Sequence, residues 1–533
     1  MREYRTPPVA ASTHLGTMAD PVYHNASADP DAVAFRRWKG GGDVTAGEFA
    51  AEVTAVGKGL IAIGVAAGDR VAILADTDYE WTLCDYAIWA VGAVSVPVYH
   101  TASTEQVAWI LADSGAGWCL VGSAEQAATV TDTGVPVRLL RLDQGVLGEL
   151  AARAAEVPDE RFQARRAVAP DEPATIIYTS GTTGRAKGVV VTHHNFLSNL
   201  DGFVARLEPV FAPGGAIVLF LSPAHIFTRT MQCAALLRRV RITHVPASAE
   251  LAAALREVRP TVLPLVPRFM EKLRDASDDA AATLGGRCTA IIVGGAPHDA
   301  GVADFYRDAG VAVYEGYGLT EVCGPATING PAAVRDGTVG RPLPGVTVRL
   351  ADDGEVLVRG DCVFGRYHRN PAATEAALVD GWLHTGDLGS LDDGYLTITG
   401  RKKDLIVTAG GKNVDPTTLE SRLRAHPLIS QAVVVGDRRP YVACLVTLDR
   451  AALRDGVPVR TQVQEAVDAA NRAVSRAEAI RAFHILDREF TVADGDLTAS
   501  GKVRRDAVSA RHRAEIEAMY RSGPGAVFPS AGG

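Results

Sequence analysis

The sequence predicts an α/β protein with a large N-terminal domain of layered, largely parallel sheets and a small C-terminal α+β domain. Three observations lead to this prediction. Strand-like apolar runs alternate with helix-like segments through the first 400 residues. The pattern changes after a charged, turn-like junction, TGRKKD at 399–404. The chain of 533 residues is also too long for one ordinary hydrophobic core, so several domains are expected.

Short continuous apolar runs predict buried strands in the N-terminal domain, because a strand covered on both faces carries apolar residues throughout. Such runs occupy residues 69–75, 93–99, 117–123, 216–222, 241–246, 261–267, 289–295 and 311–318. Segments with helical periodicity lie among them at 79–93, 104–115 and 249–261. Two later strand-like segments, 354–360 and 394–401, are hairpin-rich and predict a β-barrel-like subdomain.

The segment after the junction predicts a separate domain. Residues 429–437 and 441–449 alternate as strands, and 460–480 has the apolar spacing of an amphipathic helix. The tail from 521 to 533 is predicted to be disordered. The predicted organisation is an N-terminal domain over 1–400, a junction at 401–403 and a C-terminal domain over 404–533.

Composition and charge argue against several functional classes. A net charge of −8 disfavours nucleic acid as the main partner. The sequence suggests neither a signal peptide nor a transmembrane segment, and seven scattered cysteines without a CxxC pair indicate buried thiols, so a cytoplasmic location is expected. Lysine is scarce, with 8 residues against 46 arginines, and five lie in short polar segments: Lys187, Lys402, Lys403, Lys412 and Lys502.

The stretch YTSGTTGRAKG at 178–188 follows a buried apolar run and combines three glycines, four Ser/Thr hydroxyls and a lysine. It lacks the hydroxyl that the GxxxxGK[ST] pattern places after lysine, because Gly188 follows Lys187. The order of strand, loop and a helix at 193–200 predicts a phosphate cradle made of main-chain N–H groups and hydroxyls. A plain Ser/Gly-rich loop is the alternative.

This loop resembles the phosphate-binding loop of adenylate-forming enzymes, which include acyl-CoA synthetases, adenylation domains and luciferases. Three further segments resemble the same superfamily in the same order: YGLTE at 317–321, DGWLHTGDLG at 380–389 with GRKKD at 400–404, and GKVRRD at 501–506. The resemblance covers nearly the whole chain. It is greatest to bacterial long-chain acyl-CoA synthetases, through PVYHTAS, SPAHIF, GRKKDLIVTAGGKNV and LRAHPLISQAVVVGD.

The resemblance implies that ATP, Mg²⁺ and coenzyme A take part in the reaction. The β/γ-phosphates would lie on the loop with Lys187, and adenine would lie between the loop 295–297 and the ring of Tyr317. Asp387, expected in a turn, would accept the ribose hydroxyls with help from Arg401. The implied nucleotide-binding residues are Thr179, Ser180, Gly181, Thr182, Thr183, Gly184, Lys187, Gly295, Ala296, Pro297, Glu315, Gly316, Tyr317, Gly318, Asp387 and Arg401.

The resemblance also implies catalytic residues. Thr320 would bind the α-phosphate, and Glu321 with Thr179 would supply hard oxygen ligands for Mg²⁺. Lys502 would bridge the substrate carboxylate and the α-phosphate in the first half-reaction. Each has an ordinary structural alternative: Tyr317 as a core aromatic, Asp387 as a turn cap and Lys502 as an exposed loop lysine.

Domain movement is implied as well. In the family that the chain resembles, the small domain is mobile and rotates between half-reactions, with the pivot at the position of Lys403. Gly410 and Gly411 would line the channel for the pantetheine arm of coenzyme A. His225, in SPAHIF, would gate or orient the carboxylate, and a satisfied core histidine is the alternative.

Two features depart from the family pattern. Long-chain bacterial relatives carry a helical insertion after the segment that matches VPRFMEKL, whereas here 274–290 leads almost directly into a strand, so a shorter or bulkier acid is a candidate substrate. Ala186 stands where the family usually has proline, which is expected to loosen the approach of Lys187. Arg229, in HIFTRT, could contact substrate but is expected on a helix surface.

Several functions remain open at this point. The leading hypothesis is an acid–CoA ligase that activates a carboxylic acid with ATP. One alternative loads a carrier protein in place of coenzyme A. Another alternative performs only thioester formation from a preformed adenylate. An amino-acid adenylation domain would need an acidic anchor for the amine, which SPAHIFTRT lacks, and a nucleotide sensor without turnover would not need Lys502 and Glu321.

Overall fold

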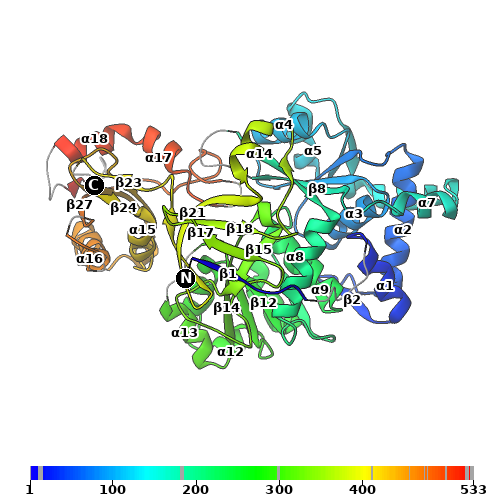
Figure 1. Cartoon of the computed structure of the whole chain (residues 1–533), viewed down its shortest axis with the longest axis horizontal. Coiled ribbons are helices and arrows are strands. Elements are labelled where there is room, and N and C mark those ends of the chain that lie inside the picture. The colour runs from blue at the N-terminus through cyan, green and yellow to red at the C-terminus, as the bar shows by residue number, and fades with distance from the viewer. Residues whose placement is uncertain are drawn as a thin grey trace.

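The computed structural model describes residues 2–9, 16–179, 185–296, 300–409, 412–454, 456–472, 474–476, 478–498, 501–521 and 527–528. The chain forms a large body and a smaller lobe, coloured orange and red on the left of Figure 1, which contains the C-terminal segment. The mixed α/β architecture with a large N-terminal part and a smaller C-terminal part confirms the predicted fold class.

A seven-stranded sheet carries the first half of the body. Its order is β19-β9-β8-β5-β4-β6-β7, parallel from β8 to β7 and antiparallel at β8–β9 and β9–β19. The strands are β4 (Arg70–Leu74), β5 (Val94–Val98), β6 (Trp118–Val121), β7 (Arg138–Arg141), β8 (Pro173–Thr179), β9 (Lys187–Thr192) and β19 (Arg366–Tyr367).

A nine-stranded sheet forms the second layer, in the order β16-β15-β14-β13-β12-β10-β11-β2-β3. It is parallel from β14 to β2, and its edge strands are antiparallel. The strands are β2 (Val33–Arg36), β3 (Asp43–Thr45), β10 (Ala216–Leu219), β11 (Arg241–His244), β12 (Val262–Leu265), β13 (Ala290–Gly294), β14 (Ala312–Leu319), β15 (Gly324–Ile328) and β16 (Arg341–Pro342).

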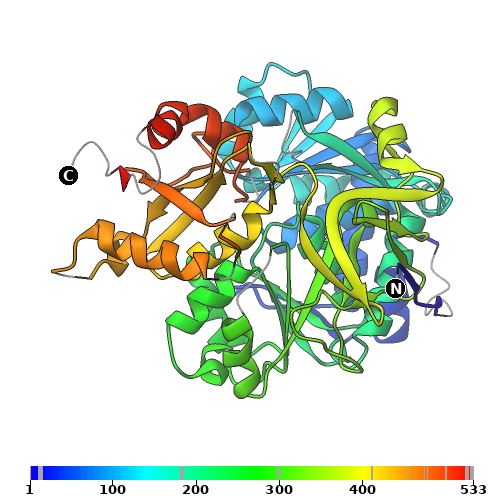
Figure 2. The same ribbon diagram turned by 60° about the vertical axis from the view of Figure 1, so that its left-hand side comes forward.

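A third, antiparallel sheet corresponds to the predicted hairpin-rich subdomain. Its path is β1-β17-β18-β21-β20, and β22 also pairs with β21. The long curved strands coloured yellow in Figure 2 belong to it. The strands are β1 (Glu3–Arg5), β17 (Thr347–Leu350), β18 (Glu355–Arg359), β20 (Leu378–Val379), β21 (Trp382–Asp392) and β22 (Tyr395–Arg401).

Helices cover the sheets of the body. They are α1 (Asp20–Ala28), α2 (Ala46–Ala62), α3 (Tyr79–Ala90), α4 (Thr104–Ser114), α5 (Ala124–Asp132), α6 (Val146–Ala152), α7 (Asp159–Arg166), α8 (His193–Arg206), α9 (Ile226–Leu237), α10 (Leu251–Val258), α11 (Pro267–Asp275), α12 (Ala280–Thr283), α13 (Ala300–Asp308) and α14 (Pro371–Ala377). Several begin with a capping box, as at Thr45 and Ser103, which satisfies the first main-chain N–H groups.

The smaller lobe begins after β22. It contains the pair β23 (Ile406–Val407) and β24 (Asn413–Val414) and a sheet in the order β25 (Ile429–Val435), β26 (Val442–Leu448), β27 (Ile480–Ile485) and β28 (Val527–Phe528). Its helices are α15 (Pro416–Arg424), α16 (Val459–Asn471), α17 (Arg505–Arg511) and α18 (Arg513–Arg521).

Two predictions for the lobe were wrong in part. The helix predicted over 460–480 ends at Asn471, because the Asn471 side chain bonds both the N–H and the carbonyl of Ile480 and so closes a loop. The tail is also not wholly without structure, since Val527–Phe528 pairs in parallel with β27.

The core of the body contains one prediction that was wrong. Arg229 lies on α9, but its side chain is fully buried rather than on a helix surface. Its guanidinium pairs with Asp85 of α3, bonds the hydroxyls of Thr175 and Ser95, and stacks 4.8 Å from the ring centroid of Trp89. The charged group is tolerated there because its donors are paired. It ties α9 to α3 and the seven-stranded sheet.

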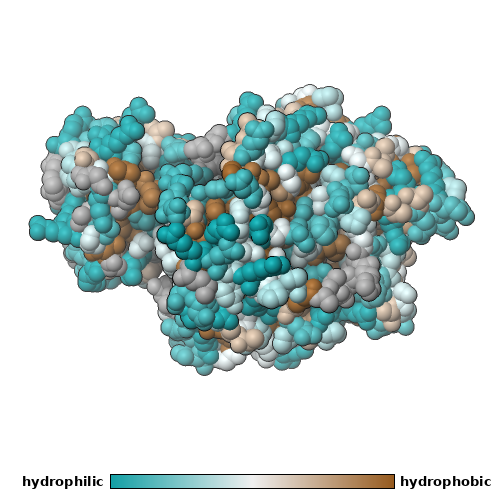
Figure 3. Space-filling view, in the orientation of Figure 1, coloured by the Kyte–Doolittle hydropathy of each residue, from teal (hydrophilic) through white to brown (hydrophobic). Residues whose placement is uncertain are grey.

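The face of the molecule in Figure 3 is largely hydrophilic, with apolar residues interspersed among polar ones. Within the described residues, no helix is long and apolar enough to cross a membrane. All seven cysteines are free, and six are buried, as expected.

Candidate active site

A cavity of about 1720 Å³ lies where the carboxyl ends of the two large sheets face the smaller lobe. The ends of β5, β8, β13 and β14 and the start of α9 line it, and the lobe contributes Lys502 and Arg504. Parallel α/β sheets bind ligands at the carboxyl ends of their strands. The volume exceeds the roughly 300–1,000 Å³ of common ligand pockets, which leaves room for a nucleotide and a second substrate.

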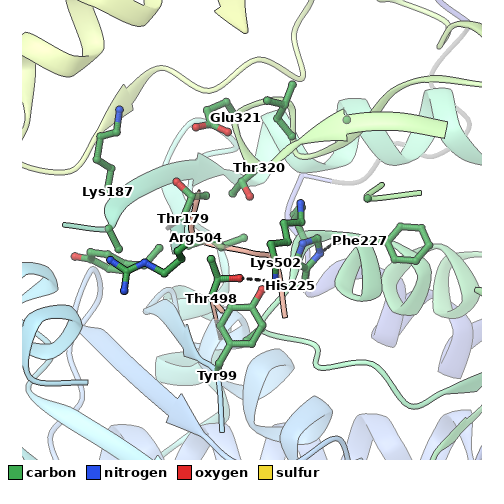
Figure 4. Close-up of a pocket in the computed structure, with 18 of the residues that line it drawn as sticks. Tyr99, Thr179, Lys187, His225, Phe227, Thr320, Glu321, Thr498, Lys502 and Arg504 are labelled. Carbon is green, nitrogen blue, oxygen red and sulfur yellow. Dashed lines mark hydrogen bonds between the residues drawn. The ribbon is translucent and has the colours of Figure 1, made fainter. Parts of the chain in front are cut away.

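The glycine-rich loop begins and ends at this cavity. Thr179 closes β8 and Lys187 opens β9, and the two residues are register partners in an antiparallel hairpin. The loop therefore joins two strands. The helix predicted at 193–200 is confirmed as α8, but the prediction missed the strand β9, which lies between the loop and that helix. Residues 180–184 lie outside the described residues. Both Thr179 and Lys187 line the cavity (Figure 4), and their contacts with phosphate and metal stay a prediction.

Thr320 and Glu321 lie in a short 3₁₀ turn, η4 (Thr320–Val322), that follows β14. A bulge at Tyr317/Gly318 precedes the turn, and a Cβ at Gly318 would come within 1.9 Å of the Gly324 carbonyl, so only glycine fits. Thr320 is nearly buried, and Glu321 points into the cavity (Figure 4).

Oxygen atoms of Glu321, at this turn, and of Thr179, at the end of β8, fit a magnesium ion. The Glu321 carboxylate and the Thr179 hydroxyl are hard donors on one cavity wall, as Mg²⁺ prefers. No cluster of three or more His, Cys, Asp or Glu side chains occurs among the described residues. A Mg²⁺ ion that binds with ATP takes few protein ligands and completes its shell with phosphate and water.

Tyr317 and Arg401 both bond to the buried carboxylate of Asp387. The Tyr317 hydroxyl donates to one oxygen of Asp387 at 2.6 Å, and Arg401 Nε donates to the other at 2.8 Å. Asp387 lies in β21, paired with Arg401 of β22, so its predicted position in a turn was wrong. Burial and the Asp387 carboxylate raise the pKa of Tyr317, which keeps the phenol protonated as the donor. Contacts of this group with adenine and ribose stay a prediction.

The other predicted nucleotide-binding residues are only partly described. Gly295 and Gly316 line the cavity, where the ends of β13 and β14 pair. Ala296 lies exposed after β13, and Glu315 is in β14. The predictions for Ser180, Gly181, Thr182, Thr183, Gly184, Pro297, Gly410 and Gly411 fall on positions outside the described residues.

Lys502 of the smaller lobe reaches the cavity beside His225 (Figure 4). A tight turn presents it: the Thr498 N–H donates to the Lys502 carbonyl at 2.7 Å, and the Lys502 N–H donates to the Thr498 hydroxyl at 3.0 Å. The side chain keeps solvent contact inside the cavity, yet the surrounding protein desolvates it. Desolvation, aided by Arg401, lowers the pKa of its ammonium.

His225 caps the N-terminus of α9. Its Nδ1 accepts the N–H of Phe227 at 3.1 Å, so the neutral ring carries its proton on Nε2. Burial, with a smaller effect of Lys502, lowers the pKa of His225 to about 3. The ring is therefore neutral at physiological pH and offers one donor near Lys502.

Some cavity residues were not predicted. Tyr99 follows β5, Phe227 lies on α9, and Thr498 and Arg504 flank Lys502 in the lobe. Tyr367 of β19 also lines the cavity. Tyr99 belongs to PVYHTAS and Arg504 to GKVRRD, so the motifs contained a signal for both. Thr498 lies in the same local turn as Lys502, whereas Tyr367 reaches the cavity only through the pairing of β19 with β9.

The sequence matches the family model described as AMP-binding enzyme over residues 22–368. The model described as AMP-binding enzyme C-terminal domain matches residues 403–523. The chain belongs to the AMP-binding enzyme family. The predicted resemblance to adenylate-forming enzymes is therefore confirmed.

Similar proteins agree with membership in the AMP-binding enzyme family. The long-chain-fatty-acid–CoA ligase FadD15 of Mycobacterium tuberculosis is 39% identical, across 98% of this chain and 100% of the relative. Among solved structures, ATP-bound MatB from Rhodopseudomonas palustris superposes with a TM-score of 0.80 at 27% identity, covering 94% of this chain and 99% of that one. A Mycobacterium tuberculosis fatty acyl CoA synthetase superposes with a TM-score of 0.70 at 25% identity, covering 94% of this chain and 99% of that one.

Proposed function

We propose that this protein is an ATP-dependent fatty acid–CoA ligase. The observation that carries the proposal is the convergence of Lys502 from the smaller lobe with His225, Thr320 and Glu321 in one cavity. Similarity to relatives named as fatty acid–CoA ligases supports the choice of substrates.

The chemistry proceeds in two half-reactions. A carboxylate oxygen attacks the α-phosphorus of ATP, the bond to the bridging oxygen breaks, and pyrophosphate leaves. The thiol of coenzyme A then attacks the carbonyl carbon of the acyl adenylate, loses its proton, and expels AMP. Activation is needed because a free carboxylate is a poor electrophile.

The cavity residues take the following roles in this proposal. Lys502 stabilises the charge that develops between the carboxylate and the α-phosphate, and Thr320 bonds the α-phosphate. Lys187 neutralises the β/γ-phosphates. Glu321 and Thr179 would hold Mg²⁺, which screens the phosphate charge when bound. His225 orients the substrate carboxylate through Nε2–H.

Domain movement belongs to the same proposal. The smaller lobe would turn about Lys403, withdraw Lys502 and bring the segment of Gly410 and Gly411 to the cavity for the second half-reaction. Ion pairs such as Arg505–Glu420 and Lys412–Glu478 join two residues of the lobe. Such pairs would stay intact when the lobe turns as a unit. We place the reaction in the cytoplasm.

The acid is proposed to be a fatty acid or a shorter or bulkier acid. The alignment with FadD15 spans 598 positions, more than the 533 residues of this chain, so that relative carries segments absent here. Between α11 and β13 the chain forms only the four-residue helix α12. Insertions near an acyl site alter the length and width of the acids accepted.

A two-part assay tests the proposal. Purified protein is supplied with ATP, Mg²⁺, coenzyme A and a panel of acids, and pyrophosphate exchange and thioester formation are measured separately. We expect both activities with a fatty acid. Thioester formation only from synthetic adenylates would support the thioesterification-only alternative, and acyl transfer only to a carrier protein would refute coenzyme A as the acceptor.

A further inference from the structure

Tyr367 lies between the two charged residues that the proposed function directs toward ATP. Its ring centroid is 4.6 Å from Nζ of Lys187, and its hydroxyl donates to Oε1 of Glu321 at 2.8 Å. Lys187 and Glu321 lie along the same side of the cavity (Figure 4). Among the described residues, no ion pair joins Lys187 to Glu321, although the two charges attract each other.

The position of Tyr367 is fixed by its strand. Tyr367 is the register partner of Val189 in β9, two residues after Lys187, and the His368 N–H donates to the Gly188 carbonyl at 2.7 Å. The ring is 6% exposed, and it packs 4.7 Å from the ring of Phe364.

The same segment also holds Glu321 by its main chain. The Phe364 N–H donates to the Glu321 carbonyl at 2.8 Å. Residues 364–368 therefore contact Glu321 twice, and they also contact Lys187 and Gly188 at the end of the phosphate loop, although they are far from both in sequence.

We infer that Tyr367 is a positioning residue that keeps Lys187 and Glu321 apart and directs them separately to the phosphates and the metal ion of bound ATP. The inference rests on the proposed function. The hydroxyl occupies one carboxylate oxygen of Glu321 and leaves the other for a metal, and such donors to a metal ligand orient it. The negative face of the ring holds the ammonium of Lys187 on its own side.

The protonation state of Tyr367 agrees with this arrangement. Burial, together with the nearby Glu321 carboxylate, raises the pKa of the phenol. The hydroxyl thus stays protonated and remains a donor to Glu321.

Two substitutions separate the two contacts. Tyr367→Phe keeps the ring under Lys187 and removes the hydroxyl, whereas Tyr367→Leu removes both. Tyr79 provides a matched control outside the cavity, because its ring lies 4.2 Å from the guanidinium of Arg37 and its hydroxyl donates to Glu52 at 2.9 Å. Tyr79→Phe therefore loses an equivalent bond without touching the site.

Titration calorimetry with ATP plus Mg²⁺, ATP plus a chelator, and AMP tests the inference without turnover. For Tyr367→Phe we expect the affinity for ATP in the presence of Mg²⁺ to weaken by about 10-fold. The affinity for ATP in the presence of chelator and the affinity for AMP should not change. For Tyr367→Leu we expect weaker binding of ATP with and without Mg²⁺, because Lys187 then pairs with Glu321, and unchanged AMP binding. Tyr79→Phe should match the wild type throughout.

Three outcomes would overturn the inference. Wild-type Mg²⁺ dependence in Tyr367→Phe would refute the role of the hydroxyl, and a loss of AMP binding in that variant would indicate general distortion. Unchanged binding of ATP in the presence of chelator in Tyr367→Leu would refute the role of the ring. If the wild type itself bound ATP no better with Mg²⁺ than with chelator, the proposed function would fail first, and the inference with it.

Discussion

The indole Nε1 of Trp109 donates a 2.8 Å hydrogen bond to the main-chain carbonyl of Ala186. The guanidinium of Arg185 stacks on the same indole at 4.7 Å. Trp109 on α4 therefore holds the last two residues before Lys187. Ala186 stands where the family usually has proline, so a tertiary contact restrains the loop end at a position where a proline ring would restrain φ.

Trp109→Phe should weaken ATP binding, because it frees the Ala186 carbonyl while keeping an aromatic ring for Arg185. We expect KM for ATP to rise about 5-fold, in line with the loss of one hydrogen bond of ~1 kcal/mol. Ala186→Pro should change KM by less than about 2-fold in the wild type and recover part of the loss in the Trp109→Phe background, because proline lowers loop entropy.

The measurement is the steady-state KM for ATP of four proteins: the wild type, Trp109→Phe, Ala186→Pro and the double variant. Trp38→Phe is the control, since Trp38 Nε1 bonds Glu250 outside the cavity. An unchanged KM for ATP in Trp109→Phe, or equal effects of Ala186→Pro in both backgrounds, would contradict the proposed restraint.

Lys502→Ala should separate the half-reactions. We expect pyrophosphate exchange to fall by ~10²–10³-fold, as for removal of a charge-stabilising group, while thioester formation from a supplied adenylate persists. Lys39→Ala, which removes an exposed partner of Glu250, should leave both rates unchanged. Equal loss of both half-reactions in Lys502→Ala would refute a role confined to the first.

The same lysine predicts a pH dependence. Desolvation lowers the pKa of Lys502, so the free enzyme loses the ammonium at lower pH than an ordinary lysine would. The kcat/KM for adenylation should fall as pH rises through that lowered pKa, whereas thioester formation from a supplied adenylate should not follow it. Lys502→Arg, which stays charged, should remove the alkaline fall from whatever adenylation activity remains.

Local sequence patterns predicted much of the fold and part of the site. Buried strands such as β4 and β13 are continuous apolar runs, so their identity is visible without tertiary context. Thr320, Glu321 and Lys502 all line one cavity, because each lies in a motif whose local turn sets its direction, and their roles stay a prediction.

Tertiary pairing explains what the patterns missed. Tyr367 reaches Glu321 because β19 pairs with β9, about 180 residues away in the chain. Local hydrophobic periodicity does not show which distant strands pair. Arg229 was expected at a surface because arginine is rarely buried, but Asp85, Thr175 and Ser95, from three separate elements, supply its partners. The hairpin after Thr179 was missed because β9 is a short apolar run directly before a helix start.

Arg229→Met should destabilise the body strongly, because it leaves the Asp85 carboxylate buried without its partner. We expect a loss of about 3–5 kcal/mol in the free energy of unfolding, measured by urea denaturation. The double variant Arg229→Met/Asp85→Leu should recover part of that loss. Arg2→Met breaks an exposed pair with Asp352 and should cost at most about 1 kcal/mol. A comparable cost in both single variants would contradict the importance of burial.

Three histidines whose rings are desolvated, His193, His225 and His244, predict that stability falls in mild acid. Burial lowers the pKa of His193 to about 4 and of His225 and His244 to about 3. In the unfolded chain these rings take up protons below pH ~6.5. The stability they contribute is therefore fully present above that pH and is lost as pH falls toward 4, by up to ~1.4 kcal/mol per pH unit for each ring. Asp78 acts in the opposite direction, because burial raises its pKa to about 7.

Urea denaturation between pH 7 and 5 checks the prediction, and His193→Asn isolates one ring. His193 Nδ1 accepts the Met18 N–H at 3.1 Å, and an asparagine oxygen can accept the same bond without titrating. The variant should therefore lose stability less steeply with acid than the wild type. The slope of its unfolding free energy against pH should correspond to about one proton fewer taken up on unfolding. Parallel pH dependences of the two proteins would show that His193 is not held neutral by burial, and would contradict the lowered pKa.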